Sequence, residues 1–457
     1  MALTSSKFLE AQSFGKKILK YLNNTGSPFH SVKQIIKYMS DHNVPITHLK
    51  ESSPWNLEKG RCYCLANDSG TMMAFKIGKN FNPSKGGLIL VASHTDSPCL
   101  KLDFKSHTSS KGFDQVNVCT YGGGLWHTWL DRELGVAGKV VVRSNNRLEE
   151  RLIHVRNPLI IVPNLAIHLQ SSQEREALKL NKQNHLRGII STECVHKLNA
   201  DETEPLLKFL AGKLNCTVED IVDIDLCLME STAATLSGVY EEFITSGRLD
   251  NLASCFASVA GFSDFILHPE GNDDSIVGIV AYNYEEIGST LEYGANSEVT
   301  SNWLNKIFST LGSKLQETSS RSLLISADMA HGVHPNYPEK HIDTHMPYFH
   351  KGVVIKRNVN GRYATDIKSS SIIKAVAEKV DVPLQDFRTG NDTPCGSTIG
   401  PYLSSRLCIP VVDVGIPQLA MHSIRETCSL VDVFDFYSLS KALFSSSNII
   451  DSYNGYN

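Results

Sequence analysis

The sequence has little of what marks several protein classes. No run approaches the roughly 18 apolar residues of a membrane-spanning helix. The 44 Lys and Arg against 48 Asp and Glu give a net charge of −4, so there is no basic surplus to attract nucleic acid or an anionic membrane. The eleven cysteines are scattered without a C-x-x-C pair, which disfavours a disulfide scaffold or a zinc ribbon. We therefore expect a protein of the reducing cytoplasm that binds neither nucleic acid nor membrane, although delivery to a vacuole stays open.

Signatures of secretion, nucleotide binding and covalent serine chemistry are also missing. Residues 1–22 mix lysines and Glu10 with apolar residues at helical spacing, which predicts an amphipathic first helix and not a secretory signal. The sequence has no G-x-S-x-G, no G-x-x-x-x-G-K-S/T and no G-x-G-x-x-G after a strand-like run. Catalysis by this chain would need another kind of site.

What the sequence does contain is four short apolar runs that each lead into residues able to bind a metal ion. Runs that are apolar on both faces are typical of strands in a largely parallel sheet covered by helices. Helical patterns at residues 252–267 and 369–380 lie between the runs. The pattern predicts an α/β fold whose mixed, largely parallel sheet is flanked by helices. The four runs are residues 87–93, 275–282, 322–327 and 409–415.

Residues 100–235 have a different character. Shorter β-like segments at 139–143 and 159–162 are followed by a charged interval at 170–185, which has few large apolar residues and predicts a mobile loop. We expect this stretch to be a β-rich second domain, inserted into an α/β domain that comprises residues 1–99 and 236–457.

The residues at the ends of the four runs suggest a site for divalent cations. In open α/β sheets, ligands bind outside the carboxyl ends of the strands. Carboxylates crowded there repel one another unless cations supply compensating charge. Three carboxylates and two imidazoles suit two such ions, which would lower the pKa of bound water towards ~7 and favour hydrolysis. The set comprises His94, Asp250, Glu286, Asp328 and His422, with Asp96 and Glu285 as acidic neighbours.

Spacing suggests roles for the acidic neighbours. In an extended segment Asp96 lies on the same face as His94, so it can accept the ring N–H that faces away from a metal. The adjacent Glu285 and Glu286 point in different directions, so one can bind metal while the other activates water.

Structural interpretations of single residues stay open. Asp250 and Asp328 each suit a helix N-cap, and His422 suits a buried core histidine. Only convergence of the whole set would make these residues ligands.

Five histidines also cluster within residues 331–350. His341 and His345 have the i,i+4 spacing of a zincin helix, but Ile342 stands where that chemistry needs a glutamate. We therefore expect the cluster to support the site through hydrogen bonds, or to lie at an interface.

Seven strings run through the sequence in a fixed order. They are Ser93-His-Thr-Asp-Ser-Pro, Tyr121-Gly-Gly-Gly-Leu-Trp, Arg248-Leu-Asp-Asn, Glu285-Glu-Ile-Gly-Ser, Ala327-Asp-Met-Ala-His-Gly-Val-His-Pro-Asn-Tyr, Asn391-Asp-Thr-Pro-Cys-Gly and Gln418-Leu-Ala-Met-His-Ser-Ile-Arg-Glu. Together they resemble the M18 family of metallopeptidases, the aspartyl aminopeptidases, and they span nearly the whole chain. The resemblance implies a zinc-peptidase-like fold in which residues 100–235 form a dimerisation domain.

The resemblance also implies a site with two Zn²⁺ ions per subunit, for which Co or Mn could substitute. Asp250 would bridge the ions, Glu285 would be the general base, and Asp96 would orient His94. The remaining ligands would be His94 and Asp328 on one ion, and Glu286 and His422 on the other.

The implied reaction removes an N-terminal Asp or Glu from peptides by metal-activated water. Lys356 matches the position that holds the acidic side chain, which charge complementarity favours, and His331 and Tyr363 would also bind substrate. His168 matches a residue that reaches the site of a neighbouring subunit. We expect a homo-oligomer, a dodecamer built from dimers as in relatives.

Four residues depart from the family pattern. Ile342 and Met346 replace a usual Glu and Arg, which bears on packing or subunit contacts around the histidine cluster. Asn283 replaces an Asp, and Gly390 replaces an Arg whose loss bears on the preference for acidic side chains. None of the four is an implied ligand or base, so hydrolysis is expected to survive. The alternatives are a related di-metal dipeptidase or deacylase, and a non-catalytic assembly or cargo protein on the same scaffold.

Overall fold

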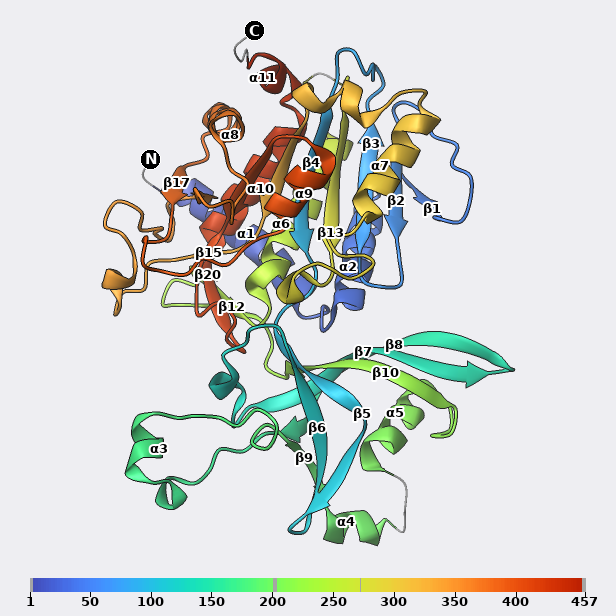
Figure 1. Ribbon diagram of the computed structural model, residues 1–457, viewed down its shortest axis with the longest axis vertical. Coiled ribbons are helices and arrows are strands. Elements are labelled where there is room, and N and C mark those ends of the chain that lie inside the picture. The colour runs from blue at the N-terminus through green and yellow to red at the C-terminus, as the bar shows by residue number, and fades with distance from the viewer. Residues whose placement is uncertain (1–2, 200–203, 272, 454–457) are drawn as a thin grey trace.

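A nine-stranded mixed sheet forms the centre of the larger part of the molecule in the computed structural model, which describes residues 3–199, 204–271 and 273–453 (Figure 1). Its strand order is β1-β2-β3-β13-β4-β14-β18-β16-β17. The four apolar runs predicted as strands are β4, β13, β14 and β18, which lie side by side and parallel. The bounds are β1 Ile46–Leu49, β2 Cys62–Ala66, β3 Met72–Ile77, β4 Leu88–His94, β13 Ile276–Tyr282, β14 Leu323–Ala327, β16 Val353–Lys356, β17 Leu384–Phe387 and β18 Val411–Gly415.

Helices cover both faces of this sheet, which is why its central strands are apolar on both sides. Ile89 and Val91 of β4 pack with α1, α2, α6, α8 and α10, whereas Leu88 and Leu90 pack with α7 and α9. The predicted α/β fold, with a mixed and largely parallel sheet flanked by helices, is confirmed. The bounds are α1 Ser5–Leu22, α2 Pro28–Asp41, α6 Leu249–Leu267, α7 Val299–Thr310, α8 Ile367–Lys379, α9 Gly400–Leu407, α10 Leu430–Phe444 and α11 Ser447–Asp451.

A closed six-stranded barrel with its own apolar core lies at the other end of the molecule (Figure 1). Its strand order is β10-β5-β6-β9-β8-β7, and β10 closes it by pairing with both β5 and β7. The bounds are β5 Cys99–Ser110, β6 Phe113–Tyr121, β7 Glu133–Ser144, β8 Arg147–Ile161, β9 Gly188–Thr192 and β10 Ile221–Glu230, with α4 Glu193–Leu198 and α5 Pro205–Leu214 beside them.

A small five-stranded sheet lies beside the nine-stranded one, in the order β11-β12-β20-β19-β15. Between β8 and β9 the chain makes a long excursion away from the barrel that contains the 3₁₀ turn Ile167–Leu169 and the short helix α3, Ser172–Glu176 (Figure 1). Within the described ranges, no helix is long and apolar enough to cross a bilayer. The small sheet comprises β11 Thr235–Ser237, β12 Phe243–Ser246, β20 Glu426–Ser429, β19 Pro417–Leu419 and β15 Ala330–His331.

Candidate active site

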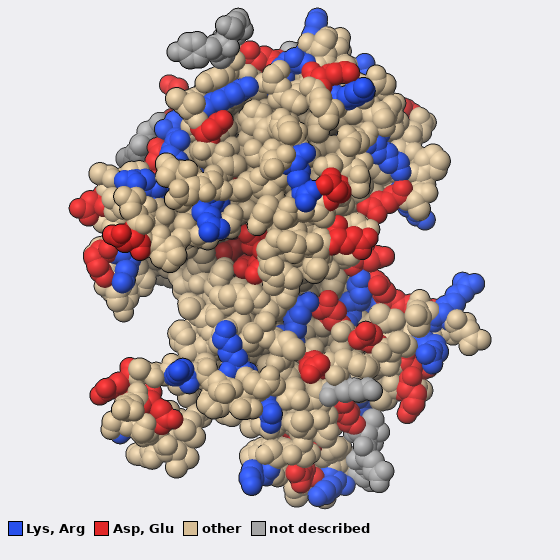
Figure 2. Space-filling view, in the orientation of Figure 1, with Lys and Arg blue, Asp and Glu red and all other residues tan. Residues whose placement is uncertain are grey.

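The ends of the central strands place the predicted ligands in one pocket. β4 ends at His94, β14 is followed at once by Asp328, and Glu285 and Glu286 lie in a 3₁₀ turn that begins three residues after β13. Because these strands are parallel neighbours, their carboxyl ends meet at one edge of the sheet. The pocket there has a volume of about 520 Å³. Figure 2 shows acidic side chains at the bottom of a hollow near the middle of this face of the molecule.

Two groups of donors share the carboxylate of Asp250. His94 Nε2 lies 3.2 Å from Asp250 Oδ1 and 3.4 Å from Asp328 Oδ1. On the other side, His422 Nε2 lies 3.3 Å from Glu286 Oε2 and 3.6 Å from Asp250 Oδ2. Each oxygen of Asp250 therefore faces a different histidine, and all five residues predicted from the strand ends lie within one cluster.

The donor set fits a divalent cation. Asp250 and Glu286 have side chains only 4% exposed, yet Asp250 Oδ1 and Glu286 Oε1 have no hydrogen-bond partner. Burying a carboxylate without a compensating charge costs roughly several kcal/mol, so a positive charge next to these carboxylates would stabilise the site. Imidazole nitrogens and carboxylate oxygens are donors that zinc accepts.

The crowded carboxylates raise the pKa values of ionisable groups in the site. The pKa of Glu285 is raised to about 8, mainly by burial; His94 lowers it, and the nearby carboxylates of Asp328, Asp96 and Asp250 raise it. The pKa of His422 rises to about 10 in spite of burial, because its ring faces the carboxylates of Asp250 and Glu286. Without a metal ion, protons on Glu285 and His422 thus neutralise part of the negative charge that a cation would otherwise balance.

Asp96 acts through both its main chain and its side chain. His94 Nδ1 lies 3.0 Å from the main-chain oxygen of Asp96, closer than the 3.5 Å to its carboxylate. The carboxylate instead accepts the N–H groups of Glu285 and Glu286, both at 3.1 Å, and the hydroxyl of Tyr121 at 2.7 Å. Asp96 therefore fixes the turn that carries the two glutamates as well as the His94 ring.

Glu426 is a supporting residue that sequence reasoning did not single out. Its buried carboxylate accepts the main-chain N–H of Asp250 at 3.0 Å and that of His422 at 2.8 Å. Burial, followed by the charge of Asp250, raises the pKa of Glu426 to about 8. The available signal was its place at the end of the string that contains His422.

The segment between β6 and the turn Trp126–Trp129 also holds His422. His422 Nδ1 lies 3.0 Å from the oxygen of Gly123, and Leu125 donates its N–H to the main-chain oxygen of His422 at 2.8 Å. Gly122 has a φ of +73°, and a Cβ there would lie 3.2 Å from the Glu286 side chain, so glycine permits the close approach. A segment adjoining the barrel thus orients one of the predicted ligands.

A buried lysine also lines the pocket. Among its described lining residues, Lys356 is the only Lys or Arg, and its buried Nζ lies 3.3 Å from Asp328 Oδ2. It lies 5.5 Å from the centre of the Tyr363 ring. His331 also lines the pocket, and desolvation of its ring, followed by the charge of Lys356, lowers its pKa to about 4.

Several predicted residues lie elsewhere. His168 is exposed in the excursion between β8 and β9 and does not line the pocket of its own chain. Gly390 lines an adjacent pocket, and Asn283 is buried, with its amide donating to the oxygen of Ser69 at 2.7 Å. In the histidine cluster, His341 bonds to the oxygen of His331 at 3.3 Å, and the cluster forms no metal-binding group among the described residues.

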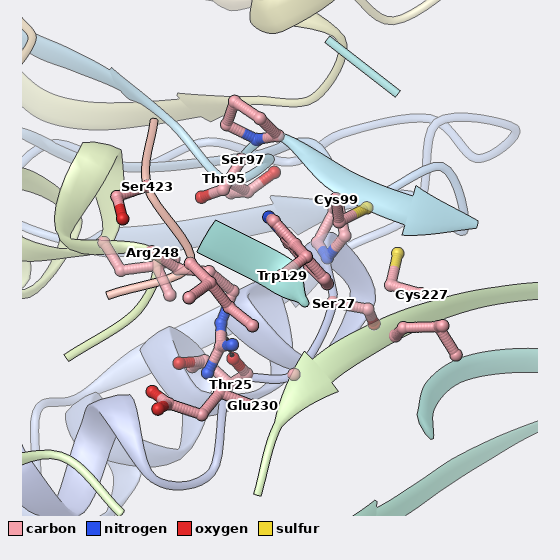
Figure 3. Close-up of a pocket in the computed structure, with 16 residues that line it drawn as sticks. Thr25, Ser27, Thr95, Ser97, Cys99, Trp129, Cys227, Glu230, Arg248 and Ser423 are labelled. Carbon is pink, nitrogen blue, oxygen red and sulfur yellow. Dashed lines mark hydrogen bonds between the residues drawn. The ribbon is translucent and has the colours of Figure 1, made fainter. Parts of the chain in front are cut away.

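A small cavity lies behind the ligand-bearing segments (Figure 3). Arg248 donates from Nε to the oxygen of Thr25 at 2.9 Å, and Ser97 donates to the oxygen of Asp250 at 2.5 Å. Its volume of about 30 Å³ admits roughly two water molecules, so it is too small for a peptide. This region packs the segment that contains Arg248 and Leu252 against β10.

Fold and site together define a metal-dependent hydrolase of the α/β class. Residues 21–444 match the family model described as "Aminopeptidase I zinc metalloprotease (M18)", and the chain belongs to this M18 family. It is therefore a metalloaminopeptidase, as the resemblance predicted.

Similar proteins agree with this membership. An aspartyl aminopeptidase of Caenorhabditis elegans is 38% identical over 94% of this chain and 95% of its own. The structure titled as the Ape4 and Nbr1 complex matches 99% of this chain and 89% of its own at 34% identity and a TM-score of 0.92. The S. cerevisiae mApe1 dodecamer matches 97% and 99% with a TM-score of 0.82, and at 24% identity this likeness shows the fold alone.

Proposed function

We propose that this aminopeptidase removes N-terminal Asp and Glu residues from peptides. The observation that carries the proposal is the position of Lys356, the only Lys or Arg among the described residues that line the pocket, next to the acidic cluster. A substrate carboxylate can form a charge-assisted hydrogen bond with this ammonium group, which a neutral side chain cannot. The aspartyl aminopeptidase activity named for the nematode relative supports the same substrate class.

We further propose that the site holds two zinc ions per subunit, with Asp250 between them. His94 and Asp328 would hold one ion, and Glu286 and His422 the other, because these are the residues on either side of the Asp250 carboxylate. When bound, the ions lower the pKa of water and polarise the scissile carbonyl.

Glu285 is assigned to proton transfer. Its side chain is 14% exposed and its Oε2 lies 4.0 Å from His94 Nε2, so it borders the pocket without joining either donor group as closely as Glu286 does. A carboxylate with a pKa near neutrality can take a proton from the attacking water and give it to the leaving amine. Asp96 holds the Glu285 main chain in place for this transfer.

The test is a panel of Asp-, Glu-, Ala- and Leu-initiated chromogenic amides, assayed before and after chelation and zinc restoration. Preference for acidic substrates with zinc-restorable release supports the proposal, and an N-acetylated Asp substrate should resist cleavage. Equal rates across the panel would favour a di-metal dipeptidase or deacylase. Metal content near zero after native purification would favour a non-catalytic assembly protein.

We also propose a dodecamer built from dimers, with residues 100–235 as the dimerisation domain. The excursion that carries His168 exposes Leu165, Ile167 and Leu169, an apolar surface that a second subunit would cover. If His168 acts on a neighbouring site, mixing inactive His168→Ala and Glu285→Gln subunits should recover part of the activity. No recovery after verified subunit exchange would place His168 outside catalysis.

A further inference from the structure

A second group of metal-binding side chains lies in the barrel, on elements separate from those that form the active site. His107 of β5 places Nε2 2.9 Å from Asp114 Oδ1, and His196 of α4 places Nδ1 3.1 Å from Asp114 Oδ2. The three donor atoms lie within 4.8 Å of one another. Both oxygens of one carboxylate on β6 therefore face an imidazole, one from each neighbouring element.

Main-chain pairing holds these three elements together. In the β5–β6 hairpin, Ser109 pairs with Asp114 and His107 with Val116, so His107 and Asp114 are diagonal neighbours. Helix α4 follows β9 directly, and the Glu193 N–H bonds to the oxygen of Gly112 in the hairpin turn at 3.0 Å. The donors thus stand on paired strands and a tethered helix, a scaffold that orients ligands better than loops do.

Burial and charge favour a cation at this position. Asp114 is 1% exposed, and besides the two imidazoles its carboxylate accepts a hydrogen bond from the Ser109 hydroxyl at 3.0 Å, whereas in the described parts of the chain no Lys or Arg pairs with it. Carboxylates this buried need compensating positive charge. The side chains of His107 and His196 are 27% and 17% exposed, so solvent and a metal ion can reach the donors.

The donor types select the ion. Two imidazole nitrogens and one carboxylate oxygen suit zinc and related transition metals, whereas Mg²⁺ and Ca²⁺ prefer oxygen donors. Bond lengths of about 2.1 Å place tetrahedral donors roughly 3.4 Å apart. The contacts of 2.9 and 3.1 Å are hydrogen bonds without an ion, and because all three donors lie within 4.8 Å of one another, side-chain adjustment can bring them around one ion.

We propose that His107, Asp114 and His196 bind a divalent transition metal of the zinc class, with water as the remaining ligand. The ion joins α4 to the hairpin and stabilises this end of the barrel, and it takes no part in peptide hydrolysis. The proposal is independent of the substrate assigned to the active site.

The experiment is elemental analysis of the full-length protein after zinc loading and desalting, with His196→Gln compared with wild type and with the exposed-histidine control His48→Gln. We expect one zinc ion fewer per chain in His196→Gln, unchanged peptide hydrolysis, and wild-type content in His48→Gln. His107→Gln, at the more exposed ligand, repeats the test if His196→Gln does not fold. Equal zinc content in wild type and in both ligand variants would overturn the proposal.

Discussion

Glu426 fixes the main chain of His422. Its Oε1 accepts the His422 N–H at 2.8 Å, at a residue whose φ of +64° lies in the left-handed region. The other carboxylate oxygen accepts the Asp250 N–H, so one buried side chain sets the positions of two proposed ligands. Partners of this kind contribute to metal affinity although they do not touch the metal.

Replacing Glu426 with Gln should therefore weaken zinc binding. The amide keeps only one oxygen acceptor, so one of the two ligand segments loses its main-chain bond, and zinc affinity should fall about 10–100-fold. The measurement is the zinc concentration that restores half of the activity to the chelated protein, with the exposed Glu270→Gln as control. Restoration at the wild-type zinc concentration would contradict this role.

Glu285→Gln should retain both metals yet lose turnover. The variant keeps the size of the side chain and removes the proton acceptor, so kcat should fall by roughly 10²–10⁴. Metal content and kcat must be measured on the same preparation. Near wild-type turnover, or loss of metal along with activity, would reject the assignment of Glu285 as base.

Lys356→Met should reduce the preference for acidic residues. Hydrogen bonds to charged groups contribute about 1.5–3 kcal/mol, so kcat/KM for an Asp-initiated amide should fall roughly 10–100-fold. Hydrolysis of an Ala-initiated amide should change much less. The exposed Lys351→Met serves as control, and a uniform loss across substrates in Lys356→Met would point to a structural effect at Asp328.

Acid should destabilise the contact between α2 and β8. The rings of His30 and His154 lie 5.2 Å apart, and burial, with Arg248 and other cations adding, lowers their pKa values from 6.5 to about 3 and about 4. Since the unfolded chain binds these protons first, stability is fully present above pH 6.5 and is lost as the pH falls towards 4.

The loss for His30 alone should be on the order of 2 kcal/mol by pH 5. The measurement is the free energy of unfolding between pH 7.5 and 5. His154→Gln should flatten the pH dependence, and the exposed control His48→Gln should not. An unchanged slope in His154→Gln would show that this pair does not control acid stability.

Local signals account for what the sequence could predict. The four apolar runs are strands because helices bury both of their faces, and their parallel order brings His94 and Asp328 to one edge. Only the three-dimensional structure could decide between the alternatives for Asp250 and His422. From the sequence, Asp250 could equally have been a helix cap and His422 a buried core residue. Asp250 makes no side-chain cap of α6, and His422 is 29% exposed beside Glu286.

Long-range pairing explains what sequence reasoning missed. Glu426 acts on Asp250 across 176 residues, and His196 meets Asp114 across 82. Neither pair has a local spacing that would predict contact. The sequence also did not reveal the two roles of Asp96. Its spacing from His94 predicts a hydrogen bond from the His94 ring to the Asp96 carboxylate, whereas in the structure the ring nitrogen lies closer to the main-chain oxygen of Asp96.

The hydrogen bond between the Gly123 oxygen and the His422 ring connects the barrel to the acidic cluster of the pocket. The Gly123 oxygen and the Leu125 N–H hold this histidine from a segment that continues directly from β6. Movement of the barrel relative to the nine-stranded sheet would therefore change the orientation of the His422 ring beside Glu286.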